Sequence, residues 1–251
     1  MRSDAREHRV SGSIAVTHRL LVTGTDTGVG KTLISAGLCA WLTQQGDRVI
    51  GFKPVESGTD ENAGEPADTV LLARCSGLEP GQCNVYALPE PLAPVLAARR
   101  AGIEIERGML DAGLARATET AEHVIVEGVG GALVEVTPGV MVADLAAQWE
   151  LQTVVVAANR LGVLSHTLLT LEGLQRRGVP VLGVVLNTVQ SGRAGLAEAT
   201  NRAELERLLP ESVPLLGVCP FVDLEDRVKP AALAASVAQI AERLFGGDEL
   251  L

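Results

Sequence analysis

A glycine-rich segment that ends in Gly-Lys-Thr carries the residue types suited to phosphate chemistry. It reads Val-Thr-Gly-Thr-Asp-Thr-Gly-Val-Gly-Lys-Thr over residues 22–32. Glycines permit backbone angles that let successive N–H groups curl around an anion. Lys31 can reach the outer phosphates of a nucleotide, and the Thr32 hydroxyl is placed to bind Mg²⁺ at the start of a helix. The segment therefore predicts a phosphate-binding loop.

The spacing departs from the commonest form of this motif by one residue. Five residues rather than four separate Gly24 from Gly30, and Thr25 takes the place of the usual first glycine. An ordinary glycine-rich turn would account for the glycines, but it gives no reason for Gly-Lys-Thr at a helix start. We therefore expect a variant loop. The residues expected at the nucleotide are Thr27, Gly28, Val29, Gly30, Lys31 and Thr32.

Three further charged residues stand where they could meet this loop. Lys53 is expected at the end of a strand, because Pro54 should stop the ladder. Glu127 ends a second apolar run and opens a glycine-rich turn. Ligands bind at the carboxyl ends of strands in open α/β sheets, so Lys53 should lie near the phosphates. A carboxylate at the position of Glu127, paired with the phosphate loop, favours a Mg²⁺ ligand over the simpler alternative of a solvated acid at a strand end. Asp68 opens a short helix, where by itself it is an ordinary helix N-terminal carboxylate.

Apolar runs alternate with helical periodicity along the whole chain. Strands are expected at 20–22, 48–52, 123–127, 153–157, 181–186 and 215–218, and helices at 31–45, 68–74, 104–122, 165–177, 193–208 and 231–244. The stretch 55–66 is expected to be a surface loop, and the prolines of 89–94 to break regular structure. Because the strands are continuously apolar, we predict a mainly parallel, doubly wound α/β sheet in a single domain. This domain should span 20–251 and follow a disordered leader at 1–19.

Composition narrows the partners and the compartment. The formal charge of −10 over 251 residues argues against nucleic acid or an anionic membrane as partner. No apolar run is long enough to cross a membrane, and the start lacks a signal-peptide core. The cysteines show no spacing typical of zinc or redox sites, which favours a reducing cytoplasm. They are Cys39, Cys75, Cys83 and Cys219.

These motifs together resemble one family, the dethiobiotin synthetases of biotin biosynthesis. The loop at 22–32 is similar to theirs, including the five-residue spacing. Other similar segments follow in the same order: 52–58 with a second lysine, 67–68 with a metal aspartate, 126–131 with a metal glutamate, and 161–166 with a loop for the substrate tail. The resemblance covers about 20–244, and it reverses the ordinary interpretation of Asp68.

The resemblance implies an ATP- and Mg²⁺-dependent ligase with a phosphate-loop fold, acting on 7,8-diaminononanoate and CO₂ and usually a homodimer. One amine captures CO₂ as a carbamate, whose oxygen attacks the γ-phosphate of ATP to form a carbamic-phosphoric anhydride. The second amine then displaces phosphate and closes the ureido ring of dethiobiotin. The substrate site is expected at the subunit interface.

The resemblance also assigns roles to individual residues. It implies catalytic roles for Lys31 and Lys53, and Mg²⁺ ligands in Thr32, Asp68 and Glu127. Asn187 stands where many members contact adenine. The expected substrate-binding residues are Thr27, Ser57, Gly162, Val163, Leu164 and Ser165.

Some of these residues have simpler interpretations, and two places depart from the family pattern. Ser57 could equally be a turn residue. His166 is interpreted as a structural residue at a helix start, because the sequence shows no carboxylate partner for it. Ser165 stands where asparagine is common, and 92–94 lacks the hydroxyl residues that some members carry. These departures concern substrate affinity more than the type of reaction.

Two alternative functions remain open at this point. Partition or site-selection ATPases of the same fold have a variant phosphate loop with a second lysine five residues before the main one. This chain has Asp26 at that position. The chain also lacks a basic surface run and a basic C-terminal helix. An amide ligase domain of the cobyrinate type calls for a fused glutaminase domain, and this chain ends where the first domain would end.

Overall fold

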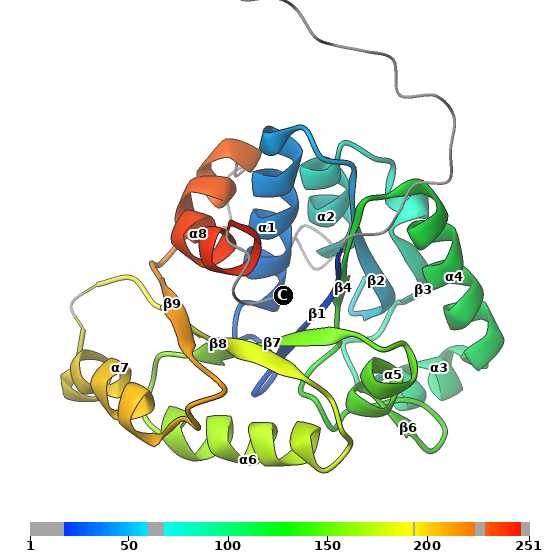
Figure 1. Cartoon of the computed structure of the whole chain (residues 1–251). Helices are drawn as coiled ribbons and strands as arrows, with labels where there is room; N and C mark the ends of the chain where they lie inside the picture. The colour runs from blue at the N-terminus through cyan, green and yellow to red at the C-terminus, as the bar shows by residue number, and fades with distance from the viewer. Residues whose placement is uncertain (1–17, 60–67, 193, 224–228, 247–251) are drawn as a thin grey trace, which may run out of the picture.

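Seven parallel strands form one sheet at the centre of the fold (Figure 1). The computed structural model describes residues 18–59, 68–192, 194–223 and 229–246. In sheet order the strands are β3 (Asn84–Leu88), β2 (Val49–Ser57), β4 (His123–Glu127), β1 (His18–Gly24), β7 (Gln152–Ala158), β8 (Val181–Asn187) and β9 (Leu215–Cys219). A separate antiparallel pair consists of β5 (Glu135–Thr137) and β6 (Val140–Met141). The predicted α/β class is confirmed.

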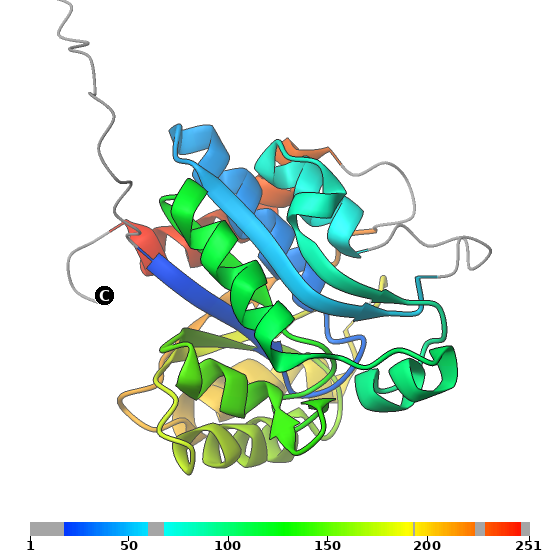
Figure 2. The same cartoon turned by 90° about the vertical axis from the view of Figure 1, so that its right-hand side faces the viewer.

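Helices cover both faces of this sheet, as Figures 1 and 2 show from two sides. One face carries α1 (Lys31–Gln45), α2 (Asp68–Ser76) and α8 (Pro230–Phe245). The other carries α4 (Arg107–Thr120), α5 (Val142–Gln148), α6 (Val163–Gln175) and α7 (Leu196–Leu208). α3 (Pro94–Ala101) and a 3₁₀ turn at Pro80–Gln82 lie beside β3.

The two faces have separate apolar cores, which explains the unbroken apolar runs. Along β7, Val154 and Val156 pack in the core under α1 and α8, whereas Val155 packs in the core on the opposite face. α1 and α8 pack so closely that a Cβ on Gly37 would lie only 2.8 Å from a methyl carbon of Val237. A sheet buried on both faces needs apolar residues at every position, not at alternate ones.

The strand order reverses beside β1. β1 continues through α1 to β2 on one side of the sheet, whereas β7 continues through α6 to β8 on the other side. The topological switch point therefore lies between β1 and β7, which pair in parallel. Ligands of open α/β sheets bind in the crevice at such a point. The phosphate loop follows β1, and the segment 159–162 follows β7, so both border this crevice.

The prediction that Pro54 ends a strand is wrong. β2 runs on to Ser57, so Lys53 lies within the strand and the predicted loop at 55–66 begins later. β2 pairs with β4 only as far as Phe52 and then continues beside β3. The N–H of Lys53 donates to Cys83 of the β3 side at 2.7 Å, so the nitrogen of Pro54 faces the side that β4 has left. No ladder bond is lost there.

Other differences concern short elements and chain segments outside the described residues. The helix expected at 104–122 begins at Arg107, and α3, β3 and α5 were not predicted. The leader at 1–19 and the domain limits of 20–251 stay predictions, because 1–17 and 247–251 lie outside the described residues. Residues 60–66 of the loop expected at 55–66 lie outside them as well. In the described ranges, none of the helices has the length and apolar character needed to span a bilayer.

Candidate nucleotide and metal site

The phosphate loop has the backbone geometry that its glycines predict. Gly28 and Gly30 take positive φ angles of 72° and 94°, which strain any residue with a side chain. α1 begins at Lys31, and its N-cap residue is Gly30, which has no side chain to cap this end of the helix. Its first-turn N–H groups can therefore bind an anion. The Nζ atom of Lys31 donates to the carbonyl of Asp26 at 3.1 Å, so the lysine folds back across the loop.

Asn187 supports the phosphate loop from the end of β8. Its side chain is buried, and its Nδ2 atom donates to the carbonyl of Val29 at 2.9 Å. A Cβ on Gly30 would overlap this Nδ2 atom. Gly30 is therefore required both for its backbone angle and for the room that Asn187 takes. The adenine contact of Asn187 stays a prediction.

Lys53 lies between two carboxylates beside the loop. Its Nζ atom is 2.7 Å from Oε1 of Glu127 and forms an ion pair with Asp68. The hydroxyl of Thr32 donates to the same Glu127 oxygen at 2.9 Å. Lys53 and Glu127 are only 4% and 1% exposed. The structure thus brings together four predicted site residues from β2, α2, β4 and α1.

Burial is the largest influence on the ionisation of this cluster. It raises the pKa of Glu127, and the nearby Lys53 opposes that rise. Burial by itself would lower the pKa of Lys53, but Glu127 and Asp68 together outweigh it, so the pKa is raised and the ammonium stays protonated. Burial lowers the pKa of Lys31 to about 8, against the opposing effect of Glu127. A phosphate group beside Lys31 would favour its charged form.

The donor set of this cluster fits Mg²⁺. Oε2 of Glu127 is buried and has no hydrogen-bond partner among the described residues. A buried carboxylate oxygen without a partner is costly, and a cation would satisfy it. Asp68 supplies a second carboxylate and Thr32 a hydroxyl, and Mg²⁺ prefers oxygen ligands while retaining several waters.

Glu56 is a site residue that the sequence analysis missed. Its carboxylate accepts the backbone N–H groups of Asp68 at 2.8 Å and Thr69 at 3.0 Å, as well as the Thr69 hydroxyl. It therefore caps the N-terminus of α2 and fixes the residue that pairs with Lys53. Its position in an expected surface loop concealed it. The sequence signal that could have identified Glu56 is a carboxylate shortly before a helix that begins with Asp-Thr.

Thr27 lies in the phosphate loop, and the other expected substrate residues fall into two groups that this chain does not bring together. Ser57 ends β2, the strand of Lys53, whereas Gly162 and Ser165 follow β7. β2 and β7 are separated by β4 and β1, which corresponds to roughly 14 Å at about 4.8 Å per strand. Gly162 is the N-cap of α6 with a φ of 95°, and as a glycine it has no side chain to cap this helix.

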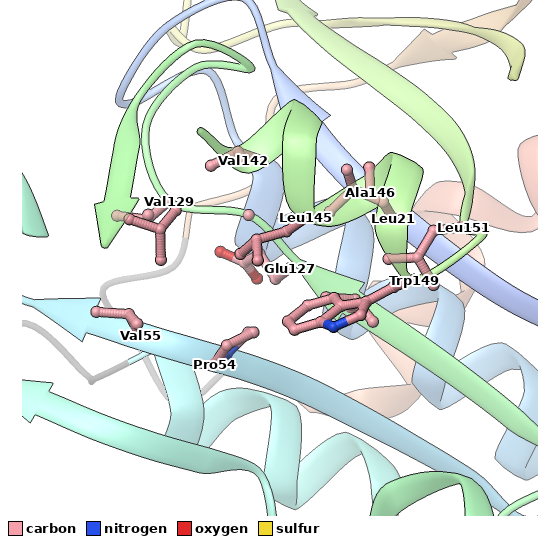
Figure 3. Close-up of a pocket in the computed structure, with 13 residues that line it drawn as sticks. Leu21, Pro54, Val55, Glu127, Val129, Val142, Leu145, Ala146, Trp149 and Leu151 are labelled. Carbon is pink, nitrogen blue, oxygen red and sulfur yellow. The ribbon is translucent and has the colours of Figure 1, made fainter. Parts of the chain in front are cut away.

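A mainly apolar pocket lies between α5 and the sheet (Figure 3). It has about 320 Å³ of empty space, including the part open to solvent. Pro54 and Val55 of β2 line one side, and Leu145 and Ala146 of α5 line another. The indole of Trp149 borders it and donates to Asp111 at 2.7 Å. Because apolar side chains predominate in its lining, this pocket is unsuited to a triphosphate.

The fold and this site define a phosphate-loop nucleotide-binding protein. A family model described as an AAA domain matches residues 18–228. The chain is 41% identical over 226 residues to the ATP-dependent dethiobiotin synthetase BioD of Anaeromyxobacter dehalogenans, covering 87% of this chain and 98% of that protein. It is 42% identical over 207 residues to the BioD protein of Bacillus licheniformis, covering 80% and 85%. The chain belongs to the ATP-dependent dethiobiotin synthetase family, as the motifs predicted.

Solved structures show the same fold at lower sequence similarity. The MinC:MinD cell division protein complex of Aquifex aeolicus superposes with a TM-score of 0.56 at 15% identity, covering 93% of this chain and 98% of that chain. At this identity the likeness concerns the fold alone. It therefore does not favour the partition or site-selection alternative.

Proposed function

We propose that this protein is an ATP- and Mg²⁺-dependent ligase that closes the ureido ring of dethiobiotin from 7,8-diaminononanoate and CO₂. The observation that carries the proposal is the cluster of Lys53, Asp68, Glu127 and Thr32 beside a phosphate loop, in a member of this family. Lys53 and Glu127 are buried in this cluster. A carbamate formed on one amine attacks the γ-phosphate, and the second amine displaces phosphate from the resulting carbamic-phosphoric anhydride.

The charges of the site suit a meeting of two anions. A carbamate and a triphosphate repel each other unless cations lie between them. In this proposal Lys31 holds the outer phosphates, and Lys53 stabilises the phosphoryl group in transfer. Thr27 and Ser57 are neutral hydroxyl residues that can bind substrate without adding charge. Thr32, Asp68 and Glu127 would hold Mg²⁺, which would neutralise phosphate charge.

Glu127→Gln should raise the Mg²⁺ concentration needed for half-maximal activity by about tenfold or more. The amide keeps the shape of the side chain but removes the negative charge that Mg²⁺ prefers. The measurement is a Mg²⁺ titration of ADP release at saturating substrates. As a control, Asp144→Asn removes a carboxylate that pairs with Arg177 on another face and should leave the titration unchanged. An unchanged Mg²⁺ requirement in Glu127→Gln would remove this residue from the metal site.

A homodimer would bring the two groups of substrate residues together. Leu161, just before α6, is 85% exposed, and Leu169 of α6 is 61% exposed. Leu133, which lies beside Gly173 of α6, is 53% exposed. Such large exposed apolar side chains around α6 suit an interface between two copies. The uncapped start of α6, with Gly162, Val163, Leu164 and Ser165, would then bind the substrate carboxylate beside Lys53 of the other copy.

Mixing two inactive variants tests this arrangement. Lys53→Ala and Gly162→Glu should each abolish activity, whereas an equal mixture after reversible subunit dissociation should regain about a quarter of wild-type activity. Each mixed dimer would carry both defects in one site and none in the other. Mass spectrometry of intact dimers would verify that mixed species form. Mixed dimers without activity would show that each site is built within one chain.

Several further observations bear on the alternatives and the compartment. Asp26 pairs with Arg160 at 3.2 Å, at the position where partition ATPases carry a second lysine. This favours the ligase, with neither nucleic acid nor membrane as a partner. Cys39, Cys75 and Cys219 are free and buried, which suits a reducing cytoplasm.

The direct test is whether ADP release depends on the diamine. Purified protein with MgATP and bicarbonate should release ADP only when 7,8-diaminononanoate is added. Glutamine with cobyrinate should not replace the diamine. Equal ADP release without the diamine would contradict the proposal.

A further inference from the structure

We infer that Arg160 and Asn201 are positioning residues that fasten the β7–α6 loop to the phosphate loop and thereby couple nucleotide binding to substrate-carboxylate binding. The β7–α6 loop comprises residues 159–162. The inference rests on the proposed function for the identity of the substrate. Its structural basis is a set of polar contacts that cross the crevice between β1 and β7.

The first contact joins the two loops directly. Nη2 of Arg160 lies 3.2 Å from Oδ2 of Asp26. The other carboxylate oxygen of Asp26 accepts the N–H of Thr27 at 2.7 Å, and its backbone carbonyl accepts Nζ of Lys31. Asp26 is thus part of the hydrogen bonding that shapes the phosphate loop. Arg160 therefore contacts Asp26, a residue of the phosphate loop that would surround the nucleotide.

The second set of contacts fixes the backbone at Arg160. Asn201 of α7 is buried, and its Nδ2 atom donates to Oδ1 of Asn159 at 2.9 Å and to the carbonyl of Arg160 at 3.2 Å. Asn159 in turn donates to the carbonyl of Glu198 on α7 at 3.2 Å. The N–H of Asn159 donates to the carbonyl of Asn187 at 2.7 Å, and Asn187 supports the phosphate loop. The β7–α6 loop is therefore connected to the phosphate loop by two routes.

The consequence concerns placement more than stability. Arg160 and Asp26 are each about half exposed, and such exposed ion pairs contribute little to folding. The β7–α6 loop, however, leads directly into the uncapped start of α6. A nucleotide that orders the phosphate loop of one copy would also order the helix start of that copy, which receives the carboxylate in the substrate site of the other copy. Coupling of this kind acts equally in both directions.

Arg160→Ala should raise the KM for 7,8-diaminononanoate about fivefold or more at saturating MgATP, with kcat changed less than about twofold. Arg160→Lys should recover part of the affinity, because it retains a cation. Asn201→Ala should reproduce the KM effect, and its thermal unfolding would verify that it folds. Arg202→Ala is the matched control, since it removes the exposed pair Arg202–Glu206 of α7, and it should leave the KM unchanged.

A double-mutant cycle separates this inference from the proposed function. ADP affinity, measured by calorimetry, requires no turnover. Arg160→Ala should change the ADP affinity of the protein that retains Asp26. It should not change the ADP affinity of the Asp26→Asn variant, because the two residues act through each other. The same effect in both backgrounds, or an unchanged diamine KM in Arg160→Ala, would overturn the inference. If the wild-type protein does not turn over the diamine, the proposed function is refuted. The double-mutant cycle on ADP affinity would still decide whether the two loops are coupled.

Discussion

Lys53→Ala should lower kcat by about a thousandfold while ATP affinity changes little, whereas Lys31→Ala should weaken ATP binding by about tenfold or more. Lys31 belongs to the phosphate loop and contacts its backbone. Lys53 instead lies between Asp68 and Glu127 on β2, where it can act on the phosphoryl group in transfer. An interaction that strengthens in the transition state affects rate more than binding.

Two measurements separate these lysines. Calorimetry with a non-hydrolysable ATP analogue reports affinity, and ADP release at saturating substrates reports kcat. The chain has only one other lysine, Lys229, which is exposed beside α8, and Lys229→Ala should change neither quantity. Lys53→Ala also leaves the buried Glu127 without its cation, so the free energy of unfolding should fall by about 3 kcal/mol. Equal losses of ATP affinity in the Lys31 and Lys53 variants would refute the division of roles.

Gly30→Ala should abolish nucleotide binding and lower the free energy of unfolding by about 2–4 kcal/mol. Its φ of 94° is unfavourable for alanine, and the new Cβ would overlap Nδ2 of Asn187. Because that side chain is buried and bonded to Val29, moving it would break a hydrogen bond. The expected loss thus comes from backbone strain and from displacement of Asn187.

Gly28→Ala is the matched control for this variant. Gly28 also has a positive φ, of 72°, but a Cβ there would meet no atom within 4 Å. It should therefore cost only the backbone term, about 1–2 kcal/mol. Chemical denaturation of both variants gives the comparison, and adding Asn187→Ala to Gly30→Ala should recover part of its stability. Equal costs for the two glycine variants would show that Asn187 does not restrict Gly30.

Local patterns were sufficient to predict the layout of the fold and most of the cluster. The phosphate loop, α1 and the buried strands follow from residue type and spacing within short windows, as Gly30 and Lys31 illustrate. Glu127 could be predicted because an apolar strand delivers it into a glycine-rich turn. Asp68 was different, because by itself it resembled any helix N-terminal carboxylate, and the family resemblance was needed to assign it to the site.

The remaining features depend on contacts between distant parts of the chain. Pro54 is compatible with a strand only because β2 changes its partner from β4 to β3 at that point. Glu56 caps a helix that begins twelve residues later, and Arg160 reaches Asp26 across 134 positions. Neither pairing leaves a periodic signal in the sequence. They arise where the fold brings strand ends together.

The central claim is best tested by following the carbon of CO₂ into product. Purified protein is incubated with ¹³C-bicarbonate, 7,8-diaminononanoate and MgATP, and the product is examined by mass spectrometry. We expect dethiobiotin labelled in its ureido carbonyl, with one ADP formed for each molecule of product. Lys53→Ala in parallel should yield almost none. ADP release without labelled dethiobiotin would contradict the claim that this site closes a ureido ring.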